Sequence, residues 1–244
     1  MAAASEKTDK MSAGKSNTRI AEETTITEKL NIFLQKNRRI LLLGVAGLAF
    51  ILAAFIIILS VREKLRENAF FKLDEFYNRY QTLMSVSSED VTETYSIQGE
   101  ISSLLADLEK FAKKNSGFAT ARSYSLIASV YEDQTNWIEA EKAWSASAKA
   151  GAKTYLAPVA LFNAAVAAEE QGKIDSAIDL YAEAANFGSA FPGSARAQFS
   201  IGRLHESRNN ISAALEAYRY LLSRWPGDPL WANLAQSRII VLSD

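Results

Sequence analysis

The sequence contains no cysteine and only one histidine, His205, in 244 residues. Disulfides, thiolate nucleophiles, cysteine-based zinc sites and cysteine lipidation are therefore excluded. A histidine-based triad would have to use His205, and a metal site would need carboxylates almost exclusively. Glycine-rich phosphate loops, nucleophile elbows and metal-ligand spacings are also missing from the sequence. We therefore predict no enzyme activity, no cofactor and no metal, and expect His205 to be a packing residue.

The sequence also has no large excess of either charge. Its 27 Lys and Arg residues nearly balance its 28 Asp and Glu residues, and the net charge is −1. Residues 1–39 are mildly basic, and residues 61–244 are mildly acidic. A nucleic-acid-binding protein would carry a clear basic excess or a basic stripe with interleaved aromatic residues. We therefore expect no nucleic-acid partner.

Polar side chains are missing from one long stretch, Ile40 to Leu59, which is flanked on both sides by Lys and Arg. A helix of this length spans roughly the 30 Å hydrocarbon core of a bilayer. No small-residue cleavage motif follows, so we predict a signal anchor with a transmembrane helix over residues 40–60. Within twenty residues, four Lys or Arg residues precede the run and five follow it, so charge does not decide its orientation. Ala49 and Ala53 would allow two such helices to approach closely, which leaves a homo-oligomer possible.

The segment before this run divides into two parts. Residues 1–24 are rich in Ala, Ser, Thr, Lys and Glu, a composition typical of a disordered tail. Residues 25–39 begin with a possible capping box, Thr25 to Glu28, and continue with apolar residues on one helical face. We predict an amphipathic juxtamembrane helix there.

The C-terminal half repeats itself every 37 residues. Ala140, Ala177 and Ala214 mark the register, and each is followed four residues later by an aromatic residue: Trp144, Tyr181 and Tyr218. Small residues also stand twelve positions before each alanine: Ala128, Ala165 and Gly202. In a helical hairpin, small side chains permit close helix approach while a large side chain fills the gap to the next unit.

Turn residues divide each copy in two and separate it from the next. Gly172-Lys173 and Asn209-Asn210 lie within copies, whereas Pro158, Pro192 and Pro226 lie between them. We predict three helical hairpins over residues 117–228 and a capping helix over residues 229–244.

Residues 61–116 contain two further amphipathic segments around a Ser/Glu-rich linker at about 85–95. We predict a membrane-proximal helical hairpin packed on the first repeat. A dimerising coiled-coil stalk is the alternative.

The small, small, aromatic and proline positions of the third copy, Gly202, Ala214, Tyr218 and Pro226, resemble those of the tetratricopeptide repeat (TPR) family. The family's repeat has 34 residues, so we place about three extra residues per copy in the loops GAKTYLAP and GSAFPGSA. The resemblance implies a TPR-like helical-hairpin solenoid. Together with the apolar run, we therefore predict an all-α chain in which a single transmembrane helix is followed by this solenoid.

The resemblance also implies that the first helix of each repeat lines a concave groove that binds proteins. Phe162 and Phe199 would then anchor a partner segment, and Arg196 and Arg203 would bind a carboxylate. The alternative is that the phenylalanines pack between repeats and the arginines are only solvated. The predicted protein-binding residues are Arg122, Phe162, Asn163, Val166, Arg196, Phe199 and Arg203.

The layout of tail, span and short repeat array, with the segment LEKFAKKNSGFATARSYSLIASVYEDQ, resembles the single-span ancillary subunits of the bacterial Sec translocon. This resemblance implies an inner-membrane protein with a periplasmic repeat domain that contacts the translocon, chaperones or clients. Our first hypothesis is an adaptor that recruits clients or accessory factors to a membrane complex. The alternative is an oligomeric structural scaffold of an envelope assembly.

Overall fold

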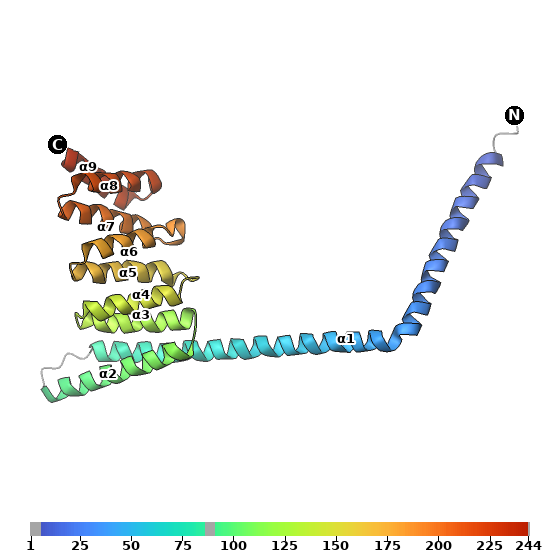
Figure 1. Ribbon diagram of the computed structural model, residues 1–244, viewed down its shortest axis with the longest axis horizontal. Helices are drawn as coiled ribbons and strands as arrows, with labels where there is room; N and C mark the ends of the chain where they lie inside the picture. The colour runs from blue at the N-terminus through green and yellow to red at the C-terminus, as the bar shows by residue number, and fades with distance from the viewer. Residues whose placement is uncertain (1–5, 86–90, 244) are drawn as a thin grey trace. The chain divides into compact units, whose positions relative to one another are not determined.

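The computed structural model describes residues 6–85 and 91–243, with side chains from residue 26 onward apart from 86–95. Within these residues every regular element is a helix, from α1 to α9, with one 3-10 turn (Figure 1). The prediction of an all-α chain is therefore confirmed. The chain divides into two compact units, Met1–Leu65 and Arg66–Asp244, and each is described by itself.

Helix α1 (Glu6–Ser85) provides all of the described structure of the first unit and continues into the second. It begins well before residue 25, so residues 6–24, predicted to be disordered, are helical, while residues 1–5 lie outside the described part. Ala, Glu and Lys favour helix, and extending an existing helix avoids the cost of a new nucleus. For the same reason the predicted capping box at Thr25 lies inside a helix rather than at a helix start.

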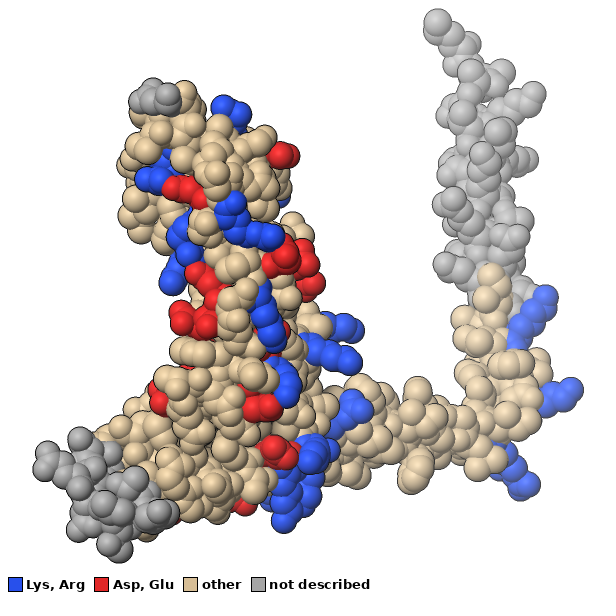
Figure 2. Space-filling model, turned by 60° about the vertical axis from the view of Figure 1, so that its left-hand side comes forward, with Lys and Arg blue, Asp and Glu red and all other residues tan. Residues whose placement is uncertain are grey.

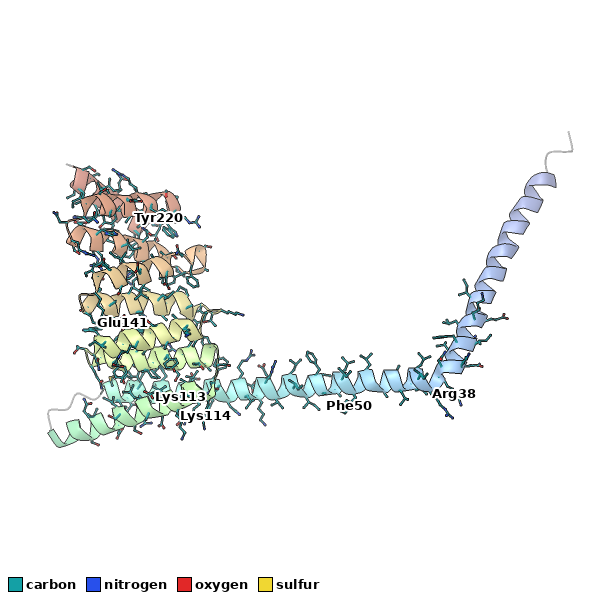
Figure 3. All side chains as sticks on the ribbon, viewed as in Figure 1. Arg38, Phe50, Lys113, Lys114, Glu141 and Tyr220 are labelled. Atoms are coloured by element: carbon teal, nitrogen blue, oxygen red, sulfur yellow. The ribbon has the colours of Figure 1, made fainter. Side chains whose placement is uncertain are left out.

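The apolar run of α1 is exposed in the first unit, as far as residues 26–65 are described. Its most apolar window is not buried at all, and it is the one stretch of the described residues long and apolar enough to cross a membrane. Phe50, near its middle, is 76% exposed and points away from the helix (Figure 3). The first unit therefore contains a candidate membrane span.

The second unit begins with the last turns of α1, which pack on α2 (Val91–Lys114). The rings of Phe76 and Phe111 meet edge to face with centroids 5.6 Å apart, and Arg79 Nη1 lies 2.9 Å from Asp107 Oδ2. Leu104 and Leu108 of α2 are fully buried in a core shared with α3 and α4. The chain itself thus buries part of the apolar face that could have formed a coiled-coil stalk, including Leu73 and Phe76, whereas Phe70 and Tyr77 are 38% and 42% exposed.

Three helical hairpins follow and stack in chain order (Figure 1). They are α3 (Phe118–Asp133) with α4 (Trp137–Ala150), α5 (Leu156–Glu170) with α6 (Ile174–Ala185), and α7 (Ser194–Ser207) with α8 (Ile211–Arg224). The 3-10 turn η1 (Gly188–Ala190) precedes α7, and α9 (Pro229–Ser243) packs on α8 and α7.

The turns inside the hairpins share one backbone geometry. Thr135, Gly172 and Asn209, spaced 37 residues apart, all have a left-handed φ of 56° to 72°. In the first and third hairpins the next residue is an N-cap, since Asn136 and Asn210 accept a hydrogen bond from the backbone N–H three residues on. The repeat in sequence is therefore a repeat in backbone conformation.

The small residues that mark the register lie at the closest helix contacts. The six positions are all buried, and the five alanines have no measurable exposure: Ala128, Ala140, Ala165, Ala177, Gly202 and Ala214. A Cβ on Gly202 would lie 2.4 Å from Cε1 of Tyr218. The aromatic ring therefore occupies the space that the missing side chain leaves.

Candidate protein-binding groove

A cavity of about 350 Å³ opens between α5, α7 and α9. Four of its residues come from α5, four from α7 and one each from α6 and α9. They are Phe162, Val166, Glu169, Glu170, Tyr181, Arg196, Phe199, Ser200, Arg203 and Trp231. Five of the seven predicted binding residues are thus brought together: Phe162, Val166, Arg196, Phe199 and Arg203.

Arg203 is bound within the protein. Its Nη1 and Nη2 atoms each donate to one carboxylate oxygen of Glu169 at 2.7 Å, a bidentate pair. The pKa of Arg203 is held above its usual range, mainly by these hydrogen bonds. Tyr181 OH also donates to Glu169 at 3.2 Å, and burial together with that carboxylate raises the pKa of Tyr181 to about 12. Arg203 therefore forms part of the groove wall. Its guanidinium binds Glu169 of the same chain, whereas the sequence predicted a carboxylate from a partner protein.

Arg196 is placed differently. Its guanidinium carbon lies 4.8 Å from the ring centroid of Phe162, a cation–π contact, and its side chain is exposed. Among the described residues no carboxylate lies within salt-bridge distance of it. Arg196 can therefore offer its guanidinium to an acceptor outside the chain.

The two phenylalanines are also unequal. Phe162 is only 8% exposed, and its ring centroid lies 5.1 Å from that of Tyr181 and 6.2 Å from that of Phe191. Phe199 is half-buried between Tyr218 and Trp231, at 5.2 and 5.4 Å. Phe162 thus forms the floor of the groove, while Phe199 and Trp231 present partly open aromatic surface.

The remaining two predicted residues lie elsewhere. Asn163 lines a neighbouring cavity of about 240 Å³, which shares Phe162 and Arg196 with the groove. Arg122 lies on α3 with its guanidinium 5.7 Å from the ring of Tyr77 in α1, and it lines neither cavity.

Sequence reasoning missed Glu169 and Trp231 as groove residues. Glu169 belongs to the groove because of its contact with Arg203, 34 residues away, and no local pattern in the sequence indicates that contact. Trp231 lies on the capping helix outside the 37-residue register, so the repeat gave no signal for it.

Ionic side chains of both signs cover the repeats. On the face that Figure 2 shows, Asp and Glu side chains lie beside Lys and Arg side chains along the stacked helices. Examples are the pairs Lys173–Glu141 at 2.8 Å and Lys142–Glu139 at 2.6 Å. In residues 26–85 and 96–243, no three His, Asp or Glu residues are arranged to hold a metal ion.

Stacked helical hairpins with a repeated turn and buried small and aromatic residues at repeated positions define a helical-repeat protein. A tetratricopeptide repeat family model matches residues 126–193 and 185–229. This part of the chain therefore consists of tetratricopeptide repeats, as the resemblance in the sequence predicted.

A curated relative supports the same assignment. A TPR repeat-containing protein of Treponema pallidum (strain Nichols) is 35% identical over 150 residues, which cover 61% of this chain and 62% of that protein. The chain thus spans less than two thirds of the relative's length. Two crystal structures of Podosopora anserina putative kinesin light chain TPR-like repeats, one of them with a single substitution, also match. Each has a TM-score of 0.48 and 12% identity, covers 70% of this chain, and is itself covered over 85% or 86%.

Proposed function

We propose that the chain is a membrane-anchored adaptor whose groove between α5, α7 and α9 binds a segment of a partner protein. TPR repeats are protein-interaction modules, and the observation that favours this groove is the cavity with Arg196, Phe199 and Trp231 at its surface. Partly open aromatic rings supply apolar contact area, and an unpaired guanidinium supplies a directional hydrogen-bond donor. The proposed ligand is an extended or helical segment with an apolar side chain beside a carboxylate.

The proposed anchor is the exposed apolar run of α1 from Ile40 to Leu59. Anchoring would raise the local concentration of the groove at the membrane, so even a weak groove contact would become effectively intramolecular. We propose the bacterial inner membrane with the repeats in the periplasm, and recruitment of clients or chaperones to a complex such as the translocon. The support is the resemblance in layout to ancillary translocon subunits.

Substitution in the groove tests the adaptor function. Arg196→Ala with Phe199→Ala removes the two open contacts, so crosslinking in cells should recover fewer of the proteins that the wild-type chain captures. Phe162→Ala should instead mainly lower stability, by about 3 to 5 kcal/mol, because that ring is buried. Tyr220→Ala is the matched control, since Tyr220 is 50% exposed on α8 and lies outside the groove (Figure 3).

The unfolding midpoint of each variant is measured beside capture. Unchanged capture by the folded Arg196→Ala, Phe199→Ala double variant would contradict the groove as the binding site. Equal loss in the Tyr220→Ala variant would show that the effect is not specific to the groove.

Orientation has its own test. Protease added to intact spheroplasts should cleave within residues 61–244 and leave the N-terminal tail intact if the repeats are periplasmic. Protection of the repeats would place them in the cytoplasm.

A scaffold that assembles through α9 is the second candidate. Leu230, Leu234 and Val241 are 58%, 40% and 57% exposed, and their spacing places them on one face of α9. Light scattering of the detergent-solubilised chain should then show an oligomer that Leu234→Ser with Val241→Ser dissociates. A monomeric wild-type chain would rule out this candidate.

A further inference from the structure

Each hairpin contains the same hydrogen bond between its two helices. A glutamate near the end of the first helix accepts from an aromatic residue of the second helix, twelve residues later. Trp144 Nε1 donates to Glu132 at 2.8 Å, Tyr181 OH to Glu169 at 3.2 Å, and Tyr218 OH to Glu206 at 3.0 Å. The three glutamates are spaced by 37 residues, so they are equivalent positions of the repeat.

In two of the three hairpins a guanidinium from a later helix completes this arrangement. Arg203 of α7 binds Glu169 through both oxygens. Arg238 of α9 binds Glu206 through both oxygens as well, with Nε 3.1 Å from Oε2 and Nη2 on Oε1. In two repeats, therefore, the glutamate at this position binds an arginine guanidinium.

In the part of the chain that the structure describes, no such guanidinium binds the glutamate of the first hairpin. The residue 37 positions before Arg203 is Val166, whose side chain is short and carries no donor. Within the described residues, the carboxylate of Glu132 accepts one hydrogen bond, from Trp144 Nε1. Neighbouring Asp133 adds negative charge and accepts a 2.6 Å hydrogen bond from Tyr80 OH of α1. Burial raises the pKa of Glu132, as expected of a partly desolvated carboxylate without a cation.

We propose that Glu132 is a docking point for an arginine side chain of a partner protein, which takes the place that Arg203 and Arg238 take in the later repeats. The position favours arginine over lysine, because a planar guanidinium can bind both carboxylate oxygens at once. The charges are complementary, since the cationic side chain would meet Glu132 and Asp133 together. The inference rests on the proposed adaptor function and assigns a second contact, between α3 and α5, to the same kind of partner.

The indole N–H of Trp144 gives a direct test, because it donates to Glu132. The full chain is labelled with ¹⁵N-tryptophan in detergent, and Trp144→Phe assigns the signal. N-acetyl-arginine amide should shift the Trp144 indole signal in a saturable way, and N-acetyl-citrulline amide, which has a similar shape but no charge, should not. Trp137, Trp225 and Trp231 are internal controls. No shift with the arginine amide, or an equal shift with the citrulline amide, would overturn the proposal.

Two variants sharpen the test. Glu132→Gln retains an acceptor for Trp144 but loses the charge, so the arginine-dependent shift should disappear. Val166→Arg supplies the guanidinium from within the chain, so the Trp144 signal should move without ligand and respond no further. A full response to the arginine amide in either folded variant would contradict the assignment.

Partner capture separates this inference from the proposed function. If capture needs Arg196 and Phe199 but is unchanged in Glu132→Gln, the adaptor function stands and the arginine docking point fails. If the Trp144 signal responds to arginine but no variant alters capture, the adaptor function fails and the guanidinium site stands.

Discussion

At the residue scale, the ring of Tyr218 lies where a side chain on Gly202 would be. Tyr218 is fully buried and donates to Glu206, so the ring cannot move aside without losing both packing and a hydrogen bond. The equivalent positions of the other repeats hold Ala128 and Ala165, which are both fully buried, so a methyl group is accommodated there. Residue size at these positions is therefore set by a particular neighbour.

Gly202→Ala should destabilise the protein by about 1 to 3 kcal/mol, because the new methyl group overpacks against Tyr218. Gly99→Ala is the control, since Gly99 lies in the exposed interior of α2 with no atom near the new Cβ. That change should stabilise by about 0.5 to 1 kcal/mol through helix propensity. Chemical denaturation measures both, and equal effects would contradict the close contact at Gly202.

Glu132→Gln should change the pH dependence of stability. The pKa of Glu132 is raised in the folded state, mainly by burial, so ionisation opposes folding. The contribution of this group is complete below its unfolded pKa of about 4.5 and is lost as pH rises through the higher folded pKa. Glutamine does not ionise, so the stability of the variant relative to wild type should rise from about pH 4 to about pH 7. Glu183→Gln, at an exposed position of α6, gives the baseline, and parallel pH curves for wild type and Glu132→Gln would contradict the expectation.

At the element scale, helices of successive hairpins are joined by polar contacts as well as by their apolar cores. Arg203 joins α7 to α5, and Lys173, before α6, joins that hairpin to Glu141 of α4. Gln171 Nε2 reaches both the backbone carbonyl of Trp137 and Glu141. These contacts join each of these hairpins to the hairpin before it, and we expect them to help set the angle between successive hairpins.

Arg203→Gln should weaken the contact between α5 and α7 by about 1 to 2 kcal/mol, because a partly buried bidentate pair is lost. Arg208→Gln is the matched control. Its partner Asp175 is 83% exposed, so the change should cost at most about 0.5 kcal/mol. Thermal unfolding of both variants checks the difference, and an equal cost would mean that burial of Glu169 adds nothing.

At the scale of the whole molecule, the two units differ in how far their apolar side chains are buried. The repeats enclose theirs between helices, whereas the apolar run of α1 is not covered by any described residue of its own unit. Water is a poor solvent for twenty such residues in sequence, and a bilayer would remove them from it. A bilayer would thus supply the apolar surroundings that the exposed run, our proposed anchor, needs.

Two arginines in the run should impair membrane integration. Phe50→Arg with Ile57→Arg adds about 3 kcal/mol per arginine to the insertion free energy, so more of the protein should become extractable at alkaline pH. Phe71→Arg with Asn78→Arg is the matched control, because Phe71 is 75% exposed on the same helix but lies beyond the run. Equal extraction of both variants would contradict the span.

The sequence by itself determined the helices of the repeats, the 37-residue period, the turns and the buried small positions, but not that α1 begins before residue 25. These depend on local backbone preference and on side chains three or four residues apart, so periodicity and turn residues encode them. Most of the candidate groove was also predictable, because corresponding positions of a solenoid share one face. Only the tertiary structure decided that Arg203 binds Glu169, that Phe162 is the floor and that Trp231 joins the groove. It also decided that, among the described residues, no guanidinium binds Glu132. These contacts join residues that are about 30 or more positions apart or that lie on different helices. They depend on the offset between stacked hairpins, and the repeat period does not specify this offset.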